Sequence, residues 1–195
     1  MQRAPFVLVT GFGPFPGRAV NPSREIARLL EAEPPPGVRV RAAELPVSFL
    51  GAPRAVRELL AQPAGPVPDL LLGLGVHEGP FFRLERRARG RYDGARLDND
   101  GHTASELRPV VGEDLECALE LAPLAEALRE AGARDVRLSD DAGGYVCEIT
   151  YHALLSGAAE HGKRALFLHV PPADVLPARA QARLVRALLA ELARA

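Results

Sequence analysis

The sequence predicts an α/β fold, a three-layer α/β/α arrangement in which helices cover both faces of a mainly parallel sheet. Short apolar runs, typical of buried strands, alternate along the chain with segments whose apolar residues recur at helical spacing. This alternation implies crossover connections between parallel strands. The length of 195 residues and a hydrophobic content of 47% fit one sizeable core, so we predict a single domain over residues 1–195.

The predicted strands are short, apolar and bounded by turn residues. They cover residues 6–10, 38–45, 69–75, 135–139 and 164–171. The second alternates apolar and polar residues, as a half-buried strand does, whereas the third is apolar almost throughout. The stretch 76–110 is polar and irregular and is compatible with a hairpin.

The predicted helices carry start and stop signals. The first begins at Asn21, a favourable N-cap, and places Pro22 in the first helical position. Gly132 closes the helix predicted at 121–132. The remaining helices are expected at 52–62, 146–162 and from about 178 to the end of the chain.

Composition excludes several classes of protein. A net charge of −1 gives no reason to expect a nucleic-acid or anionic membrane partner. The two cysteines form no C-x-x-C and there is no H-E-x-x-H, so we expect no metal and no cofactor. The apolar run at 6–9 is too short for a signal peptide, and no run approaches the roughly 20 residues that span a bilayer. We therefore expect a cytoplasmic protein.

Chemistry in such sheets is expected where parallel strands end, because that edge forms a crevice. The rule selects the loops that follow Thr10, Leu74, Ser139 and His169.

A glycine-rich turn, "TGFGPFPGRAVNPS" at 10–23, follows the first strand. Its position is that of a phosphate loop, but Pro14 and Pro16 have no N–H to offer an anion. Phe12 and Phe15 stand where a nucleotide loop has small residues. We interpret the loop as an apolar pocket wall, with simple core filling by the two rings as the alternative.

Cys147 is the candidate nucleophile. It follows the turn at Gly143-Gly144 and falls in the first turn of a helix, where the helix dipole is expected to lower the pKa of a thiol. The alternative is that Cys147 is a small buried hydrophobe. Cys117 lacks such a setting and is expected to fill core space.

His169 is the candidate base, because it ends a strand at the edge where chemistry is expected. The third group, which would orient the base, does not follow from spacing. Glu85 is one of several acidic residues at 76–110 that could fill the role, and Arg96 could donate to a developing oxyanion.

Three segments together resemble the pyroglutamyl peptidase I family, also called pyrrolidone carboxyl peptidases. They are "VTGFGPFPGRAVNPS", "AGGYVCEITYHALL" and "ALFLHVP", and the resemblance spans nearly the whole chain. It implies a cytoplasmic cysteine peptidase that removes N-terminal pyroglutamate from peptides and assembles as a homotetramer. It also implies an α/β/α fold and a Cys-His-Glu triad.

Carried over residue by residue, the resemblance implies Cys147 as nucleophile, His169 as base and Glu85 as its orienting carboxylate. It implies Arg96 as the arginine that precedes an Asp-Asn pair. The substrate-binding residues expected from the resemblance and from the edge rule are Phe12, Phe15, Leu74, Tyr145 and Val146.

The sequence departs from the family at Glu148, where the family usually has Asn, and in the loop at 76–100. These departures motivate an alternative function, a catalytically impaired family member that binds a small molecule or a peptide. A nucleoside-processing enzyme is a second alternative, disfavoured because no phosphate site is present.

Overall fold

A six-stranded sheet forms the centre of the computed structural model, which describes residues 3–61, 66–91, 94–107 and 112–194. Its strand order is β2-β1-β3-β8-β4-β7. The strands are β1 (Phe6–Phe12), β2 (Arg39–Leu45), β3 (Leu70–Val76), β4 (Phe82–Glu85), β7 (Val136–Ser139) and β8 (Arg164–Val170). A separate two-stranded ladder pairs β5 (Arg87–Ala88) with β6 (Leu115–Glu116).

The sheet is mainly parallel, as predicted. β2, β1, β3 and β8 run in one direction, with β3 and β8 in register from Leu70↔Arg164 to Val76↔Val170. β4 runs antiparallel to β8, and the edge strand β7 is parallel to β4. The last two strands of the sheet therefore point opposite to the other four.

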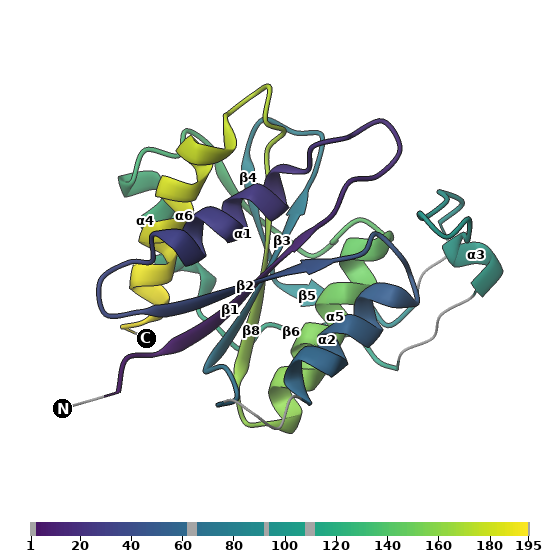
Figure 1. Cartoon of the computed structure of the whole chain (residues 1–195), viewed down its shortest axis with the longest axis horizontal. Helices are drawn as coiled ribbons and strands as arrows, with labels where there is room; N and C mark the ends of the chain where they lie inside the picture. Colours follow the sequence, from purple (N-terminus) through teal and green to yellow (C-terminus); the bar gives the residue numbers. More distant parts are fainter. Residues whose placement is uncertain (1–2, 62–65, 92–93, 108–111, 195) are drawn as a thin grey trace.

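Helices cover both faces, which confirms the three-layer prediction (Figure 1). α1 (Pro22–Ala32), α4 (Leu121–Glu130) and α6 (Ala178–Leu192) pack together on one face. α2 (Gly51–Leu60) and α5 (Val146–Glu160) pack on the other, and the short α3 (Ala104–Leu107) lies at the right-hand edge of the molecule in the view of Figure 1. Two apolar cores result, because successive residues of each central strand point to opposite faces.

The predicted helix ends hold. The Asn21 side chain accepts a hydrogen bond from the backbone N–H of Ser23 at 3.2 Å, and Pro22 opens α1. Gly132 has φ +109°, a left-handed conformation that ends α4 and that glycine adopts without strain.

The stretch 76–110 differs from the prediction, because no hairpin forms among its described residues. β4 instead inserts between β8 and β7, and β5 pairs with β6. Phe82 and Leu84 point into one core while Arg83 and Glu85 point to the other face. The sequence did not predict this strand because two of its four residues, Arg83 and Glu85, are charged.

The prediction that Ser139 ends a strand at the same sheet edge as Thr10 and His169 is wrong, because β7 runs in the opposite direction. Ser139 lies at the end of a strand that runs against the four parallel ones. The segment 140–145 leads from there into α5, whose first turn lies beside the end of β3. The connecting loop, rather than the strand direction, brings the helix start to the expected edge.

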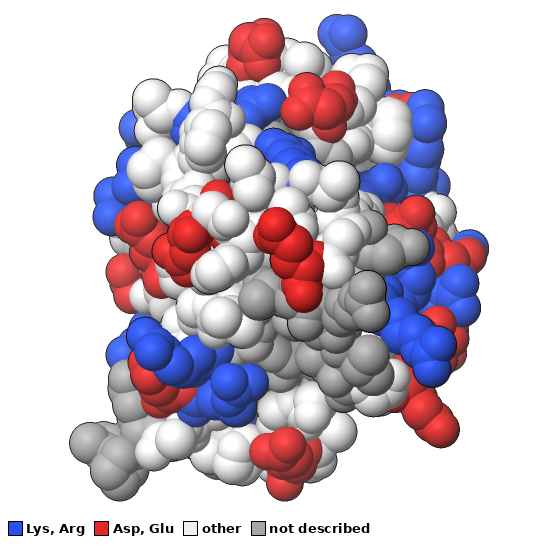
Figure 2. All heavy atoms as spheres, turned by 90° about the vertical axis from the view of Figure 1, so that its right-hand side faces the viewer, with Lys and Arg blue, Asp and Glu red and all other residues white. Residues whose placement is uncertain are grey.

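Basic and acidic side chains are interspersed on the face seen in Figure 2. In the part of the chain that the structure describes, every helix is too short or too polar to cross a membrane.

Candidate active site

A buried carboxylate and a buried imidazole form the centre of the candidate site. Glu85 Oε1 lies 2.6 Å from His169 Nδ1, and both side chains are almost completely buried. His169 belongs to β8 and Glu85 to β4, so the antiparallel pairing of these strands brings the two together. With Nδ1 bound to the carboxylate, Nε2 is the ring nitrogen left to exchange a proton.

Arg83 contacts the same pair. Its Nε donates to Glu85 Oε1 at 2.6 Å, and its Nη2 lies 3.4 Å from His169 Nδ1. Tyr151, fully buried on α5, donates its hydroxyl to the backbone carbonyl of Glu85 at 2.9 Å. The carboxylate is thereby fixed through both its side chain and its backbone.

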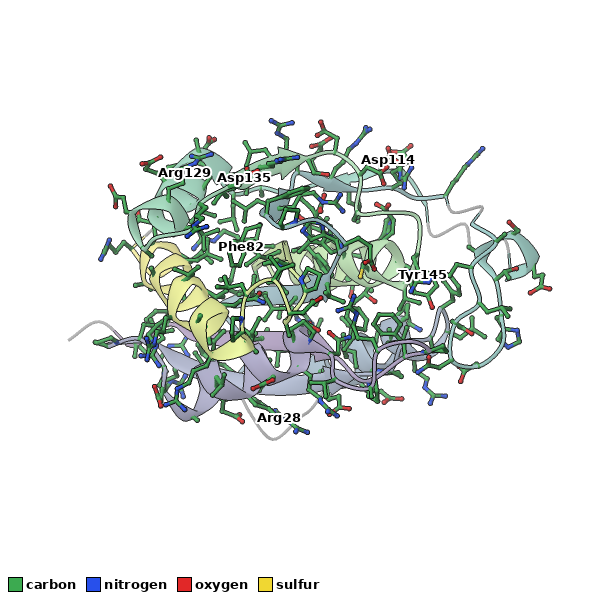
Figure 3. The ribbon with its side chains drawn as sticks, turned by 90° about the horizontal axis from the view of Figure 1, so that it is seen from above. Arg28, Phe82, Asp114, Arg129, Asp135 and Tyr145 are labelled. Carbon is green, nitrogen blue, oxygen red and sulfur yellow. The ribbon has the colours of Figure 1, made fainter. Side chains whose placement is uncertain are left out.

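Cys147 is the second residue of α5, and its sulfur lies against Gly75 near the end of β3. A Cβ on Gly75 would stand 2.9 Å from Cys147 Sγ, so glycine leaves the space that the thiol occupies. Gly75 is paired with His169 across the β3–β8 ladder. Cys147 and His169 are therefore neighbours at one sheet edge. Figure 3 shows Tyr145, the N-cap of α5, at this end of the molecule, far from Arg129 of α4.

The thiol and the imidazole are both held towards their neutral forms. Burial, and next the negative charge of Glu85, raises the pKa of Cys147 to about 12. Burial lowers the pKa of His169, although Glu85 opposes this effect. The sequence argument from the helix dipole predicted a lowered thiol pKa, and it is wrong because burial outweighs the helix terminus here.

A pocket opens beside the thiol. Apart from Cys147 itself, its lining is apolar or aromatic with two polar side chains: Phe12, Phe15, Asn21, Val47, Val76, Arg96, Tyr145 and Val146. Both interpretations of the glycine-rich loop hold at once for Phe12, which is 3% exposed in the core and also lines this pocket. The Arg96 guanidinium stacks 4.5 Å from the Tyr145 ring centroid and 5.3 Å from that of Phe15.

The segment that carries Arg96 is tied to the pocket walls. Tyr145 donates its hydroxyl to the carbonyl of Leu97 at 2.8 Å, and the Asn99 side chain donates to the carbonyl of Pro14 at 2.9 Å. The Asp98 carboxylate, 4% exposed, accepts the backbone N–H of Phe49 at 2.8 Å. These bonds connect the segment that follows Arg96 to three other chain segments.

Leu74 is not brought to the pocket, contrary to prediction. It is fully buried in the core beneath α1, α4 and α6, on the opposite face of the sheet. The strand period of two explains the error, since Gly73 and Gly75 face α5 and Leu74 between them must face away.

Glu148 is a fully buried anchor and not an unbalanced charge beside the thiol. Its carboxylate accepts two bonds from the Arg89 guanidinium, at 2.8 and 3.1 Å, and the backbone N–H groups of Arg89 and Gly144. Asp141 also contacts Arg89, at 2.6 Å. The turn before Cys147 is thus held by a charged cluster.

Several residues of the site were missed by sequence reasoning: Arg83, Arg89, Val47 and Val76. Arg83 stands two residues before Glu85, which is the spacing that puts two side chains on one face of a strand. That signal was present, but only recognition of 82–85 as a strand would have made it usable. Cys117, as predicted, has no place in the site; burial raises the pKa of its thiol, whose Sγ lies 3.4 Å from the Ala165 carbonyl.

No group of three His, Cys, Asp or Glu side chains within the described ranges could hold a metal ion. A thiol, an imidazole and a carboxylate bonded to that imidazole, at one sheet edge beside an apolar pocket, form an arrangement that could perform acyl transfer.

Comparison with known proteins decides the family. A family model described as pyroglutamyl peptidase matches residues 6–183. This chain belongs to the pyroglutamyl peptidase family.

Individual relatives agree with this placement. Pyrrolidone-carboxylate peptidase of Streptomyces coelicolor is 36% identical over 203 residues, covering 96% of this chain and 92% of the relative. That of Thermococcus onnurineus is 34% identical over 170 residues, covering 85% and 82%. The crystal structure of pyrrolidone carboxyl peptidase from Thermus thermophilus superposes with a TM-score of 0.81 at 33% identity, covering 94% of this chain and 98% of the other.

Replacing the buried anchor of this pyroglutamyl peptidase family member should destabilise the fold. Glu148→Gln removes the buried negative charge that binds Arg89 and the Gly144 N–H, and leaves Arg89 with the exposed Asp141 as its charged partner, so we expect a loss of about 2 kcal/mol in the free energy of unfolding. Asp141→Asn is the matched control: Asp141 contacts the same arginine but is 63% exposed, and the expected loss is below about 0.5 kcal/mol. Urea denaturation of both variants measures this, and equal losses would contradict the anchor role.

The raised thiol pKa predicts slow alkylation near neutral pH. In a Cys117→Ser background, the rate of Cys147 modification by iodoacetamide should rise about tenfold per pH unit from pH 7 to 9, because only the thiolate reacts. A rate that levels off near neutral pH would show a pre-formed thiolate and would contradict a neutral Cys147 thiol beside a neutral His169.

Proposed function

We propose that this protein hydrolyses the amide bond that follows an N-terminal pyroglutamyl residue, by a Cys-His-Glu mechanism. The observation that carries the proposal is the buried Glu85–His169 pair beside Cys147 at an uncharged, ring-lined pocket. Family membership supports the substrate class, since the relatives are named pyrrolidone-carboxylate peptidases.

The pocket suits a flat lactam. Phe12, Phe15 and Val47 offer apolar walls, and a five-membered ring with no charged amine needs few polar partners. The described lining contains no carboxylate, and its one permanently charged side chain is that of Arg96. A free N-terminal ammonium would therefore lose its hydration without gaining a counter-charge, so the pocket favours pyroglutamate over ordinary N-termini.

Acylation begins with a neutral thiol. Cys147 Sγ attacks the pyroglutamyl carbonyl carbon while His169 Nε2 takes the thiol proton. Glu85 stabilises the imidazolium that forms, through its bond to Nδ1. The carbon–nitrogen bond then breaks, and His169 returns the proton to the leaving amine of the shortened peptide.

Deacylation repeats the sequence with water. His169 takes a proton from water as the water oxygen attacks the thioester carbonyl, the carbon–sulfur bond breaks, and the sulfur regains the proton. Pyroglutamic acid leaves. The Cys147 N–H lies in the first turn of α5, where helix geometry provides it with no intrahelical acceptor, so it is a candidate donor for the oxyanion. Arg96, at the same pocket, is the second candidate donor.

The alternative of an impaired binding protein gains no support. Its main motive was Glu148, and that carboxylate is neutralised by Arg89. The homotetramer and the cytoplasmic location remain predictions drawn from the resemblance.

Release of a fluorophore from a pyroglutamyl amide tests the proposal, with alanyl and prolyl amides as substrate controls. We expect activity on the pyroglutamyl amide alone. Cys147→Ala should lower kcat/KM by about 10³-fold or more, because the acyl intermediate cannot form. Cys117→Ala, which removes the cysteine outside the site, should keep the activity of the unmodified protein. Equal activity on all three amides, or full activity in Cys147→Ala, would contradict the proposal.

A further inference from the structure

We propose that Arg83 is a positioning residue, which orients the Glu85 carboxylate and keeps His169 in the neutral, proton-accepting form. The inference deepens the proposed function and rests on it for its catalytic meaning. Arg83 contributes no atom to the pocket lining, so its role is exerted through Glu85 and His169.

Strand pairing fixes the arrangement. Arg83 is the register partner of His169 across the β4–β8 ladder, and Glu85 follows it on the same face of β4. Arg83 Nε and His169 Nδ1 each lie 2.6 Å from Glu85 Oε1, so two donors converge on one carboxylate oxygen. The second oxygen, Oε2, is buried and has no partner among the described residues. The orientation of the carboxylate therefore depends on the two bonds at Oε1.

The carboxylate and the guanidinium that binds it differ in solvent exposure. Glu85 is completely buried, whereas the Arg83 side chain is 23% exposed. The guanidinium thus closes the solvent side of the carboxylate and brings a permanent positive charge next to the imidazole. Guanidinium keeps this charge at every pH that the enzyme meets.

A positive charge at 3.4 Å from Nδ1 disfavours a second positive charge on the imidazole. The other titratable or charged groups that face His169 come from several elements. They are Glu85 on β4, Glu148 and Cys147 on α5, and His77 in the loop after β3, whose ring centroid lies 5.9 Å from that of His169. The carboxylates favour the imidazolium, and Arg83 is the fixed cation that opposes them; in keeping with this, Arg83 acts to lower the pKa of His169.

The consequence concerns the acidic limb of activity. Without Arg83, Glu85 would act on His169 unopposed, and the pKa of the imidazole should rise. A protonated His169 cannot accept the thiol proton, so activity should be lost at a higher pH than in the unmodified protein. A higher pKa of His169 therefore shifts the acidic limb of the pH profile to higher pH.

The test compares Arg83→Gln with Arg86→Gln and Arg83→Lys. Arg86→Gln is the matched control, because it also removes one positive charge, three residues away. Arg86 pairs with the exposed Asp140. Two readouts are used, the pH profile of kcat/KM on a pyroglutamyl amide and the NMR titration of the His169 ring, assigned by its absence in His169→Ala. If Arg83→Gln does not fold, Arg83→Met keeps the aliphatic stem and replaces it.

For Arg83→Gln we expect both the acidic limb and the His169 titration to move up by about one pH unit. In kcat/KM this gives a loss about tenfold larger on the acidic limb than on the plateau. Arg83→Lys should restore the position of the limb but not the full plateau, because an ammonium cannot present the planar fork. Arg86→Gln should match the unmodified protein.

An equal loss at all pH values, with an unmoved His169 titration, would show a merely structural role and overturn the inference. The titration needs no substrate. Absence of pyroglutamyl hydrolysis in the unmodified protein would therefore refute the proposed function, while the titration would still decide whether Arg83 acts on His169.

Discussion

A fully buried carboxylate needs donors within reach, and Glu85 obtains one, Arg83, from its own strand and the other, His169, through the antiparallel pairing of β4 with β8. The reversal places Arg83 opposite His169 and Glu85 two residues beyond it. A parallel strand at this position would have needed a long crossover and would have brought other residues to His169. The direction of β4, which is opposite to that of β8, thus brings Glu85 and His169 together.

Cys147 reaches the same place by a different route. It belongs to the first turn of α5, which follows the loop after β7, and the absence of a side chain at Gly75 gives its sulfur room beside β8. Glu148, the next residue, fixes the turn through Arg89 and Gly144. One turn of helix therefore carries both the Cys147 thiol and the buried anchor that holds the turn, and burial of this region raises the pKa of the thiol.

Most of the frame could be predicted from the sequence, because apolar runs of 69–75 and 164–171 and the caps at Asn21 and Gly132 are local signals. The placement of Cys147 and His169 at one edge of the sheet could also be predicted from their positions in the fold. The features that could not be predicted depend on strand pairing between segments that are far apart in the sequence. The four-residue β4 has no apolar run, so its place in the sheet, the role of Arg83 and the neutral state of the thiol were hidden. The prediction that Leu74 lines the pocket was wrong for a simpler reason: side chains alternate along β3, so Leu74 points into the core on the other face of the sheet.

The most direct test of this account is a crystal structure of Cys147→Ala with a pyroglutamyl peptide bound. The account predicts the lactam ring in the pocket between Phe12, Phe15 and Val47, the scissile carbonyl at the start of α5, and His169 Nε2 facing the leaving nitrogen. It also predicts that Glu85 stays bonded to both Nδ1 of His169 and Nε of Arg83. A ring bound elsewhere, or a His169 detached from Glu85 in the complex, would contradict it.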